Sequence, residues 1–385
     1  MSRVELTIRS SYVSRWGLKE GVRELIQNAL DQEAMDKSNA MSIKYENETL
    51  FIANKNSYLT RDTLLFGTTT KEGLQNTIGQ FGEGYKLAML CLTRQGYKVT
   101  IFNKALNEVW KPILINKRSM NNAEILAIDI CKESLFNFNK ENNLLITVEG
   151  ITVDEFKDLQ NDNLILADYY KNATINKDYY ANEYGKVLIQ SNYKGKIFVS
   201  GLYVTTINTL VYGYDFRPGL LKLNRDRDMI AGFDVQWETG KVVTSLPDYM
   251  LSGLIMRGSA DTEYLQLTLE QRLKESSIKQ AARNIWKDVK SQYGLAMPCA
   301  TETEANIYRA MNIPAAVINS QVTGLFKEMN LLDEIKDEVS KDTRENEGNF
   351  KSLGKEILNY LLKNADVIST RVASDLADII NKWEK

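Results

Sequence analysis

The chain of 385 residues contains no histidine. This absence excludes Ser-His and Cys-His catalysis, metal sites with histidine ligands, and a phosphohistidine formed on this chain. General acid–base catalysis would have to depend on carboxylates, Lys, Tyr or Cys. A candidate active site is therefore sought among those residue types.

Cysteine is also scarce: Cys91, Cys131 and Cys299 lie far apart and form no CxxC pair. This usage favours a reducing, cytoplasmic location with buried thiols. No apolar run is long enough to cross a bilayer, and residues 1–10 lack the apolar core of a signal peptide. We expect a cytoplasmic protein with no membrane association.

Neither sign of charge is in excess, since the formal net charge is -2 and the pI is about 5.7. This balance gives no strong nucleic-acid signature. The apolar fraction of 43% and the charged fraction of 25% are ordinary for a soluble globular protein. The length allows two or three domains.

A glycine-rich segment at residues 78–88 is the most informative local feature. Gly79, Gly82 and Gly84 precede an apolar, helical pattern. Glycines let the backbone approach a ligand, and a helix N-terminus offers N–H groups to phosphate. No Gly-Lys-Ser/Thr follows, so this is not a Walker loop. The segment predicts phosphate binding, with an ordinary turn as the alternative.

A helix is predicted over about residues 16–37, with Ser14 as its N-cap. Glu24, Asn28 and Asp31 follow at i, i+4 and i+7, so they share one face. One interpretation is a solvated helix face. The other is a site where a carboxylate and a carboxamide hold a water and a hydrated Mg²⁺ together.

Strand patterns surround these two segments. We expect strands at 4–8, 41–45, 49–53, 97–102, 108–115, 123–130 and 144–148, and a second β-rich group at 187–190, 195–199 and 202–206. The order of helix, hairpin, glycine loop, helix and meander predicts an α+β layer. In it, helices cover one face of a mixed sheet.

Four of these elements resemble motifs of the GHKL ATPases, the superfamily of DNA gyrase B, Hsp90, sensor histidine kinases and MutL. Residues 24–31 resemble its N-box, and residues 54–59 occupy the place of its Asp-x-Gly-x-Gly box. Residues 68–71 resemble the start of its ATP lid, and residues 79–86 resemble its second glycine box. Their order and spacing agree over about the first 150 residues. The resemblance implies a Bergerat-type α/β sandwich that binds ATP.

The resemblance also implies roles for matched positions. Glu24 would be the general base that orients the attacking water, Asn28 would coordinate Mg²⁺, and Asp31 would lie near the nucleotide. The remaining ATP-binding positions would be Asn54, Thr69, Thr70, Lys71, Gly79, Phe81, Gly82, Glu83, Gly84, Tyr85 and Lys86. Mg²⁺ is the implied cofactor, and ATP the substrate or ligand.

Some positions depart from the family pattern. Asn54 replaces the aspartate that reads the adenine amino group, and Asn56 and Tyr58 replace glycines. A carboxamide can present a donor or an acceptor, so we expect weaker base discrimination. The alternative is that Asn54 is a turn residue. The family's later Gly-Thr strand is not clearly matched, although Thr147 lies close to its place.

We predict three domains: an ATP-binding domain at 1–160, a β-rich segment at 161–235 and a helical domain at 236–385. The middle segment would be a transducer or would complete the first domain. Its Lys222, Arg225 and Arg227 are candidate sensors of the γ-phosphate, unless the alternating charges there form an exposed, self-paired turn.

Two functions remain open from the sequence. The first is a Mg-dependent ATPase whose slow hydrolysis switches a conformation or a homodimer. The second is a nucleotide-binding scaffold or sensor that hydrolyses little and acts through protein–protein contacts. In either case the helical domain at 236–385 is the candidate surface for dimerisation or for an unidentified protein partner.

Overall fold

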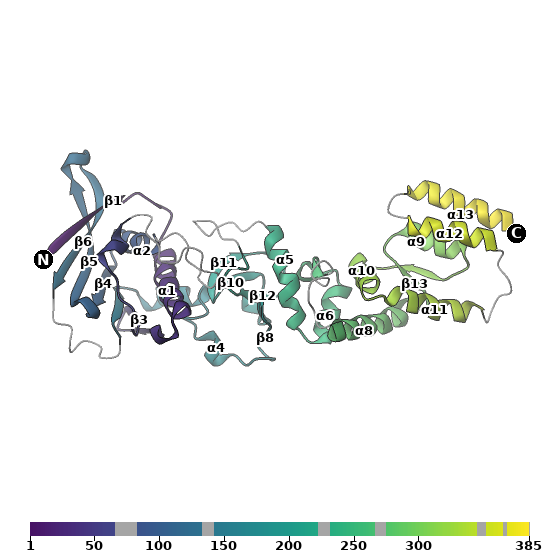
Figure 1. Ribbon diagram of the computed structural model, residues 1–385, viewed down its shortest axis with the longest axis horizontal. Helices are drawn as coiled ribbons and strands as arrows, with labels where there is room; N and C mark the ends of the chain where they lie inside the picture. The colour runs from purple at the N-terminus through teal and green to yellow at the C-terminus, as the bar shows by residue number, and fades with distance from the viewer. Residues whose placement is uncertain are drawn as a thin grey trace. The chain divides into compact units, whose positions relative to one another are not determined.

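The computed structural model describes residues 1–65, 83–132, 142–221, 232–265, 275–344, 352–364 and 368–384 (Figure 1). The chain forms two compact units. The first holds Met1–Thr174, Ile197–Thr205 and Asp215–Met229, and the second holds Ile175–Lys196, Thr206–Tyr214 and Ile230–Lys385. The three-part division at residues 160 and 235 stays a prediction.

A seven-stranded sheet forms the base of the first unit, with the strand order β1-β6-β5-β4-β7-β3-β2. The strands are β1 (Ser2–Arg9), β2 (Met41–Glu46), β3 (Thr49–Asn54), β4 (Lys98–Asn103), β5 (Glu108–Lys117), β6 (Ala123–Lys132) and β7 (Leu144–Glu149). All seven lie where the sequence predicted strands. The expected α+β class is confirmed.

The expectation of a mixed sheet is wrong for these seven strands, because each neighbouring pair is antiparallel. Strand β7 explains the difference. It lies between β3 and β4 and is antiparallel to both, so β3 and β4 run parallel to each other without being paired. The crossover through α2 (Gly84–Arg94) therefore creates no parallel ladder.

One face of the sheet packs against helices α1 (Leu18–Met35) and α2. Leu50 of β3 and Ile146 of β7 share a buried core with Val22 of α1 and Leu90 of α2. The two helices also approach each other closely at Gly21. A Cβ atom there would lie 2.7 Å from Leu92 Cγ, so only glycine fits without displacement.

Helix α1 begins at Leu18, and its N-cap is Gly17. The prediction of Ser14 as the N-cap is therefore wrong. The backbone N–H of Gly17 donates to the Glu20 carboxylate at 2.7 Å. A carboxylate three residues into the helix satisfies a backbone donor at the helix start, so no hydroxyl is needed at the cap.

Helix α3 (Val153–Asn161) follows β7 in the first unit, capped by the Thr152 hydroxyl in a capping box with Glu155. The ring of Phe156 stacks on Tyr45 with the centroids 3.9 Å apart. This contact ties α3 to the edge strand β2. A short helix, α4 (Tyr169–Asn172), comes next.

A second sheet has five strands in the order β11-β10-β12-β9-β8. They are β8 (Tyr179–Ala181), β9 (Gly185–Leu188), β10 (Lys196–Val199), β11 (Leu202–Thr206) and β12 (Gly213–Phe216). Strands β9, β10 and β11 correspond to the predicted strand group. Strands β8 and β12 were not expected: β8 has only three residues, and all four residues of β12 are buried.

The second unit is helical from residue 232 onward, as expected, apart from one small sheet. Its helices are α5 (Gly232–Val242), α6 (Asp248–Met256), α8 (Glu275–Tyr293), α9 (Glu302–Ala310), α10 (Ser320–Glu328), α11 (Leu331–Arg344), α12 (Ser352–Lys363) and α13 (Thr370–Glu384). The small sheet pairs β13 (Met297–Cys299) in parallel with β14 (Ala315–Val317). Helix α9 connects these two strands. Because of this sheet, the region is not purely helical.

Short 3-10 helices complete the described secondary structure. They are η1 (Lys37–Asn39), η2 (Arg61–Leu64), η3 (Lys104–Leu106), η4 (Arg118–Met120), η5 (Ser191–Tyr193), η6 (Val243–Ser245) and η7 (Ala260–Thr262).

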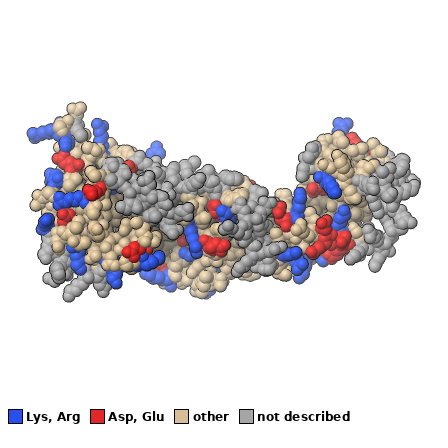
Figure 2. Space-filling model, in the orientation of Figure 1, with Lys and Arg blue, Asp and Glu red and all other residues tan. Residues whose placement is uncertain are grey.

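No helix in the described ranges is both long enough and apolar enough to cross a membrane. The side chains of Cys91 and Cys299 are buried, as expected, and Cys131 is half-buried. Basic and acidic side chains are mixed over the face of the first unit drawn in Figure 2. That mixture agrees with the near-zero net charge.

Candidate functional site

The polar face of α1 is buried. Glu24, Asn28 and Asp31 are 3%, 9% and 1% exposed, respectively. The interpretation of this face as an ordinary solvated surface is therefore wrong. Because the opposite face of the same helix packs on the sheet, α1 is enclosed on both sides. Burying carboxylates and an amide is costly unless they are hydrogen-bonded or paired. The buried polar face is therefore a candidate binding or catalytic site.

Gly84, at the start of α2, meets this polar face. A Cβ atom at residue 84 would lie 2.5 Å from Glu24 Oε2 and 3.1 Å from Asn28 Nδ2. The predicted N-box and the last glycine of the predicted glycine box thus come together, although 56 residues separate Asn28 from Gly84. Only a residue without a side chain leaves this contact undisturbed.

The side chains of Glu24 and Asn28 each have a defined neighbour. Asn28 Nδ2 donates to the backbone carbonyl of Glu24 at 2.8 Å, which fixes the end of the amide that carries the nitrogen. Glu24 Oε1 lies 3.8 Å from Arg23 Nε. Arg23 was not among the residues singled out from the sequence, since periodicity assigns it only to the side of α1.

Tyr85 and Asp31 are electrostatically coupled. The pKa of the Tyr85 hydroxyl is raised, first by burial and then by the negative charge of Asp31. Tyr85, the second residue of α2, is therefore close enough to Asp31 of α1 for the Asp31 charge to act on its hydroxyl. Glu83 is the N-cap of α2, and its carbonyl accepts from the Leu87 N–H at 3.1 Å.

Lys86 has a different environment from the expected one. Its side chain is fully buried, and its ammonium group donates to the carbonyls of Thr63, at 3.0 Å, and Leu65. Burial lowers its pKa. In the described structure, Lys86 thus connects the start of α2 to η2, while a role in phosphate contact stays a prediction.

Asn54 lies at the end of β3, buried against α1. Its Nδ2 donates to the carbonyls of Ala29 and Asn39, both at 2.9 Å. Two carbonyl acceptors fix the amide nitrogen in place, because the amide oxygen would be repelled there. Asn54 therefore links β3 to α1 and to η1, and it is not the freely rotating amide that weak base discrimination would require. An aspartate could not make these two bonds.

Thr147 does not lie on the helix-covered face of the sheet. Residues 144, 146 and 148 of β7 belong to the core beneath α1 and α2. Successive side chains of a strand alternate between faces, so Thr147 points to the other face, where its hydroxyl approaches the Thr100 carbonyl. It does not supply the threonine of the resembled family on this side.

Several predicted site residues fall outside the described residues. They are Thr69, Thr70, Lys71, Gly79, Phe81 and Gly82, together with the candidate sensors Lys222, Arg225 and Arg227. Within the described ranges, no group of three or more Cys, Asp and Glu side chains is arranged to hold a metal ion. A divalent ion held by a single amide oxygen and by phosphate would not require such a group.

Comparisons with known proteins add little about function. No protein-family model matches the chain. The chain is 24% identical over 243 residues to a protein of Mycoplasma pneumoniae strain M129 that is named only as uncharacterized. The match covers 60% of this chain and 92% of that protein.

Proposed function

We propose that the first unit binds Mg-ATP beside the polar face of α1 and the start of α2, and hydrolyses it slowly. The observation that carries this proposal is the meeting of Gly84 with Glu24 and Asn28. A glycine at a helix start supplies backbone N–H groups and a positive dipole end for phosphate. The adjacent carboxylate and amide supply what a water and a hard cation need.

The residues present fit the proposed chemistry. Phosphoryl transfer depends mainly on positioning and on preorganised charges. Glu24 would accept a proton from the attacking water, and the Asn28 oxygen would hold Mg²⁺, which neutralises phosphate charge when bound. Asp31 and Tyr85 would complete the wall of the site, since they are already coupled.

The fold of the first unit supports the proposal that it is a Bergerat-type sandwich. Two antiparallel helices, α1 and α2, cover one face of an antiparallel sheet. Their polar residues meet at one end of this layer, at the start of α2. Together with the resemblance of residues 24–31 and 79–86, this arrangement favours the GHKL type of nucleotide site.

One observation favours the second candidate, a nucleotide-binding scaffold or sensor with weak hydrolysis. Arg23 Nε lies 3.8 Å from the Glu24 carboxylate. A guanidinium at that distance competes with water for the carboxylate. If this pairing persists with nucleotide bound, Glu24 is a poor base and the protein acts through its bound state.

Partners remain part of the proposal. Large apolar side chains are exposed on the last two described helices, with Tyr360 of α12 65% exposed and Ile379 of α13 60% exposed. Exposed apolar groups on neighbouring helices are typical of interaction surfaces. We infer that the helical region binds a protein partner or a second copy of the chain.

Mg-ATP binding by the full-length protein tests the proposal. We expect millimolar Mg-ATP to raise the melting temperature and to give a saturable calorimetric signal, with about 2.7 kcal/mol of stabilisation at a hundred times the dissociation constant. Glu24→Ala should bind Mg-ATP but lose about a hundredfold in turnover. Glu33→Ala, the same change on the same helix away from Gly84, serves as the control.

The two candidate functions give different results in this experiment. Phosphate release by the wild type that falls in Glu24→Ala supports the ATPase. Binding without measurable release in either protein supports the scaffold or sensor. Absence of any Mg-ATP binding by the wild type contradicts both.

A further inference from the structure

One arginine binds the turn that follows β1, at residues 10–16, at four places. The guanidinium of Arg94, the last residue of α2, donates to four backbone carbonyls of this turn. The acceptors are Ser10 at 2.8 Å, Tyr12 at 3.0 Å, Val13 at 3.2 Å and Trp16 at 2.7 Å. The turn is therefore a preorganised element, although it has no regular secondary structure.

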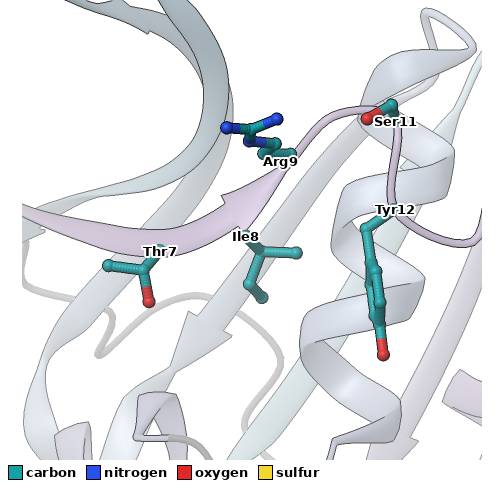
Figure 3. A pocket seen from close by; sticks show the side chains of 5 residues that line it. All are labelled: Thr7, Ile8, Arg9, Ser11 and Tyr12. Atoms are coloured by element: carbon teal, nitrogen blue, oxygen red, sulfur yellow. The ribbon is translucent and has the colours of Figure 1, made fainter. Parts of the chain in front are cut away.

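A pocket of about 590 Å³ opens beside this turn, lined by Thr7, Ile8, Arg9, Ser11 and Tyr12 (Figure 3). Strand β1 is irregular here, since its register against β6 shifts between Glu5 and Arg9. Such irregularities re-aim side chains at the edges of sheets. In Figure 3 the Ser11 hydroxyl points in the direction of the Arg9 guanidinium.

Basic residues are frequent in the segment that lines the pocket. Residues 6–19 contain Arg9, Arg15 and Lys19 and no Asp or Glu. Lys19 is paired with Asp162 at 2.6 Å. Within the described part of the chain, no carboxylate lies within ion-pair distance of Arg9 or Arg15. Arg94 adds a third guanidinium, whose described hydrogen bonds are all to carbonyls, and the Glu20 carboxylate lies near it, where it accepts from the Gly17 N–H.

The pocket is separate from the proposed nucleotide site. Gly84 begins α2, and Arg94 ends it. Ten residues of α-helix span about 15 Å. A ligand beside the turn would therefore contact neither Glu24 nor Asn28.

We propose that this pocket binds the phosphate group of a small phosphorylated organic molecule. An arginine guanidinium offers paired N–H donors that match phosphate oxygens, and the Ser11 hydroxyl can add another donor. The Tyr12 ring, which is 37% exposed, gives the organic part an apolar surface. A volume of this size suits a small-molecule ligand.

Phenyl phosphate and inorganic phosphate are the probes, used with the full-length protein in buffer that contains a chelator and no Mg²⁺. Calorimetry should show that the wild type binds phenyl phosphate more tightly than phosphate. Arg9→Gln should weaken both by at least about tenfold, because a charge-assisted pair is lost. Tyr12→Ala should remove the preference for phenyl phosphate.

Arg118→Gln removes an exposed arginine elsewhere on the same unit and should bind as the wild type does. Asn28→Ala should also bind both probes normally, which separates this site from the proposed nucleotide site. Arg9→Gln should keep the wild-type melting temperature without ligand, since Arg9 is exposed. Equal affinity in Arg9→Gln and wild type, no binding by the wild type, or no preference for phenyl phosphate would overturn the proposal.

Discussion

Buried carboxylates in the two units have opposite surroundings. Asp261, in the second unit, accepts from the backbone N–H groups of Val211 and Tyr212 and from the hydroxyls of Tyr214 and Ser259, at 2.6–3.2 Å. Glu24, in the first unit, faces Gly84, where even a Cβ atom would be too close.

This contrast separates a buried acid with a structural role from a buried acid that is a candidate for function. Asp261 is surrounded by donors from its own unit, which hold the segment at 211–214 against η7. No ligand is needed to explain it. The acid on α1 adjoins backbone that must lack a side chain, which is how proteins bring a ligand or another backbone close. Burial alone distinguishes neither case, since both residues are under 4% exposed.

The largest effect is expected at Asp261. Asp261→Ala leaves four donors without their acceptor in a buried place, and each such loss is costly. We expect the second unit to lose about 3 kcal/mol or more of unfolding free energy, measured by urea denaturation. Asp337→Ala, at an exposed position of α11, should change it little. A small loss of unfolding free energy in Asp261→Ala would show that Asp261 is not a structural acid.

Asn54→Asp tests whether this residue is structural. The change replaces two N–H donors by a carboxylate oxygen that faces two carbonyls. We expect a loss of about 2 kcal/mol in unfolding free energy and no gain in preference for ATP over GTP. Asn56→Asp, where the amide makes one exposed bond to the Ser38 carbonyl, is the matched control. A sharper preference for ATP in Asn54→Asp would instead restore the base-reading role.

Gly84→Ala changes the candidate site with little change in the fold. The new Cβ must displace the end of the Glu24 side chain, which is flexible, and alanine gains helix propensity of about 0.5–1 kcal/mol over glycine. We expect nearly unchanged stability and at least a tenfold loss of Mg-ATP turnover. In Gly253→Ala, where the nearest atom is 3.8 Å from the new Cβ, turnover should remain normal. Normal turnover in Gly84→Ala would show that Glu24 does not act at this contact.

The smallest effect is expected for an ion pair with one exposed partner, Arg3, whose side chain is 45% exposed. Arg3 contacts Asp129 at 2.6 and 2.9 Å, and this hydrogen-bonded pair lowers the pKa of Asp129 below its ordinary value of 3.8. A lowered pKa stabilises the fold above the ordinary value, and the stabilisation disappears as pH falls through the lowered value. Arg3→Gln should therefore be slightly less stable than wild type at pH 7. The difference should vanish near pH 2, as followed by thermal unfolding at both pH values.

Local sequence patterns predicted the strands β1 to β7 and the helix α1. Strand patterns located β1 to β7, and the helical period placed Glu24, Asn28 and Asp31 on one face of α1. These are local properties, because a strand or a helix repeats its side-chain direction within a few residues. Strand β8 has only three residues, and every residue of β12 is buried, so the sequence did not mark them.

How these elements are used depends on contacts between distant parts of the chain. Long-range pairing inserted β7 between β3 and β4, which made the sheet antiparallel and turned Thr147 away from the helices. Packing of α2 on α1 brought Gly84 to Glu24. Two backbone carbonyls accept hydrogen bonds from the amide of Asn54. Such choices depend on which surfaces bury each other across many residues, and no local pattern encodes a partner that lies far along the chain.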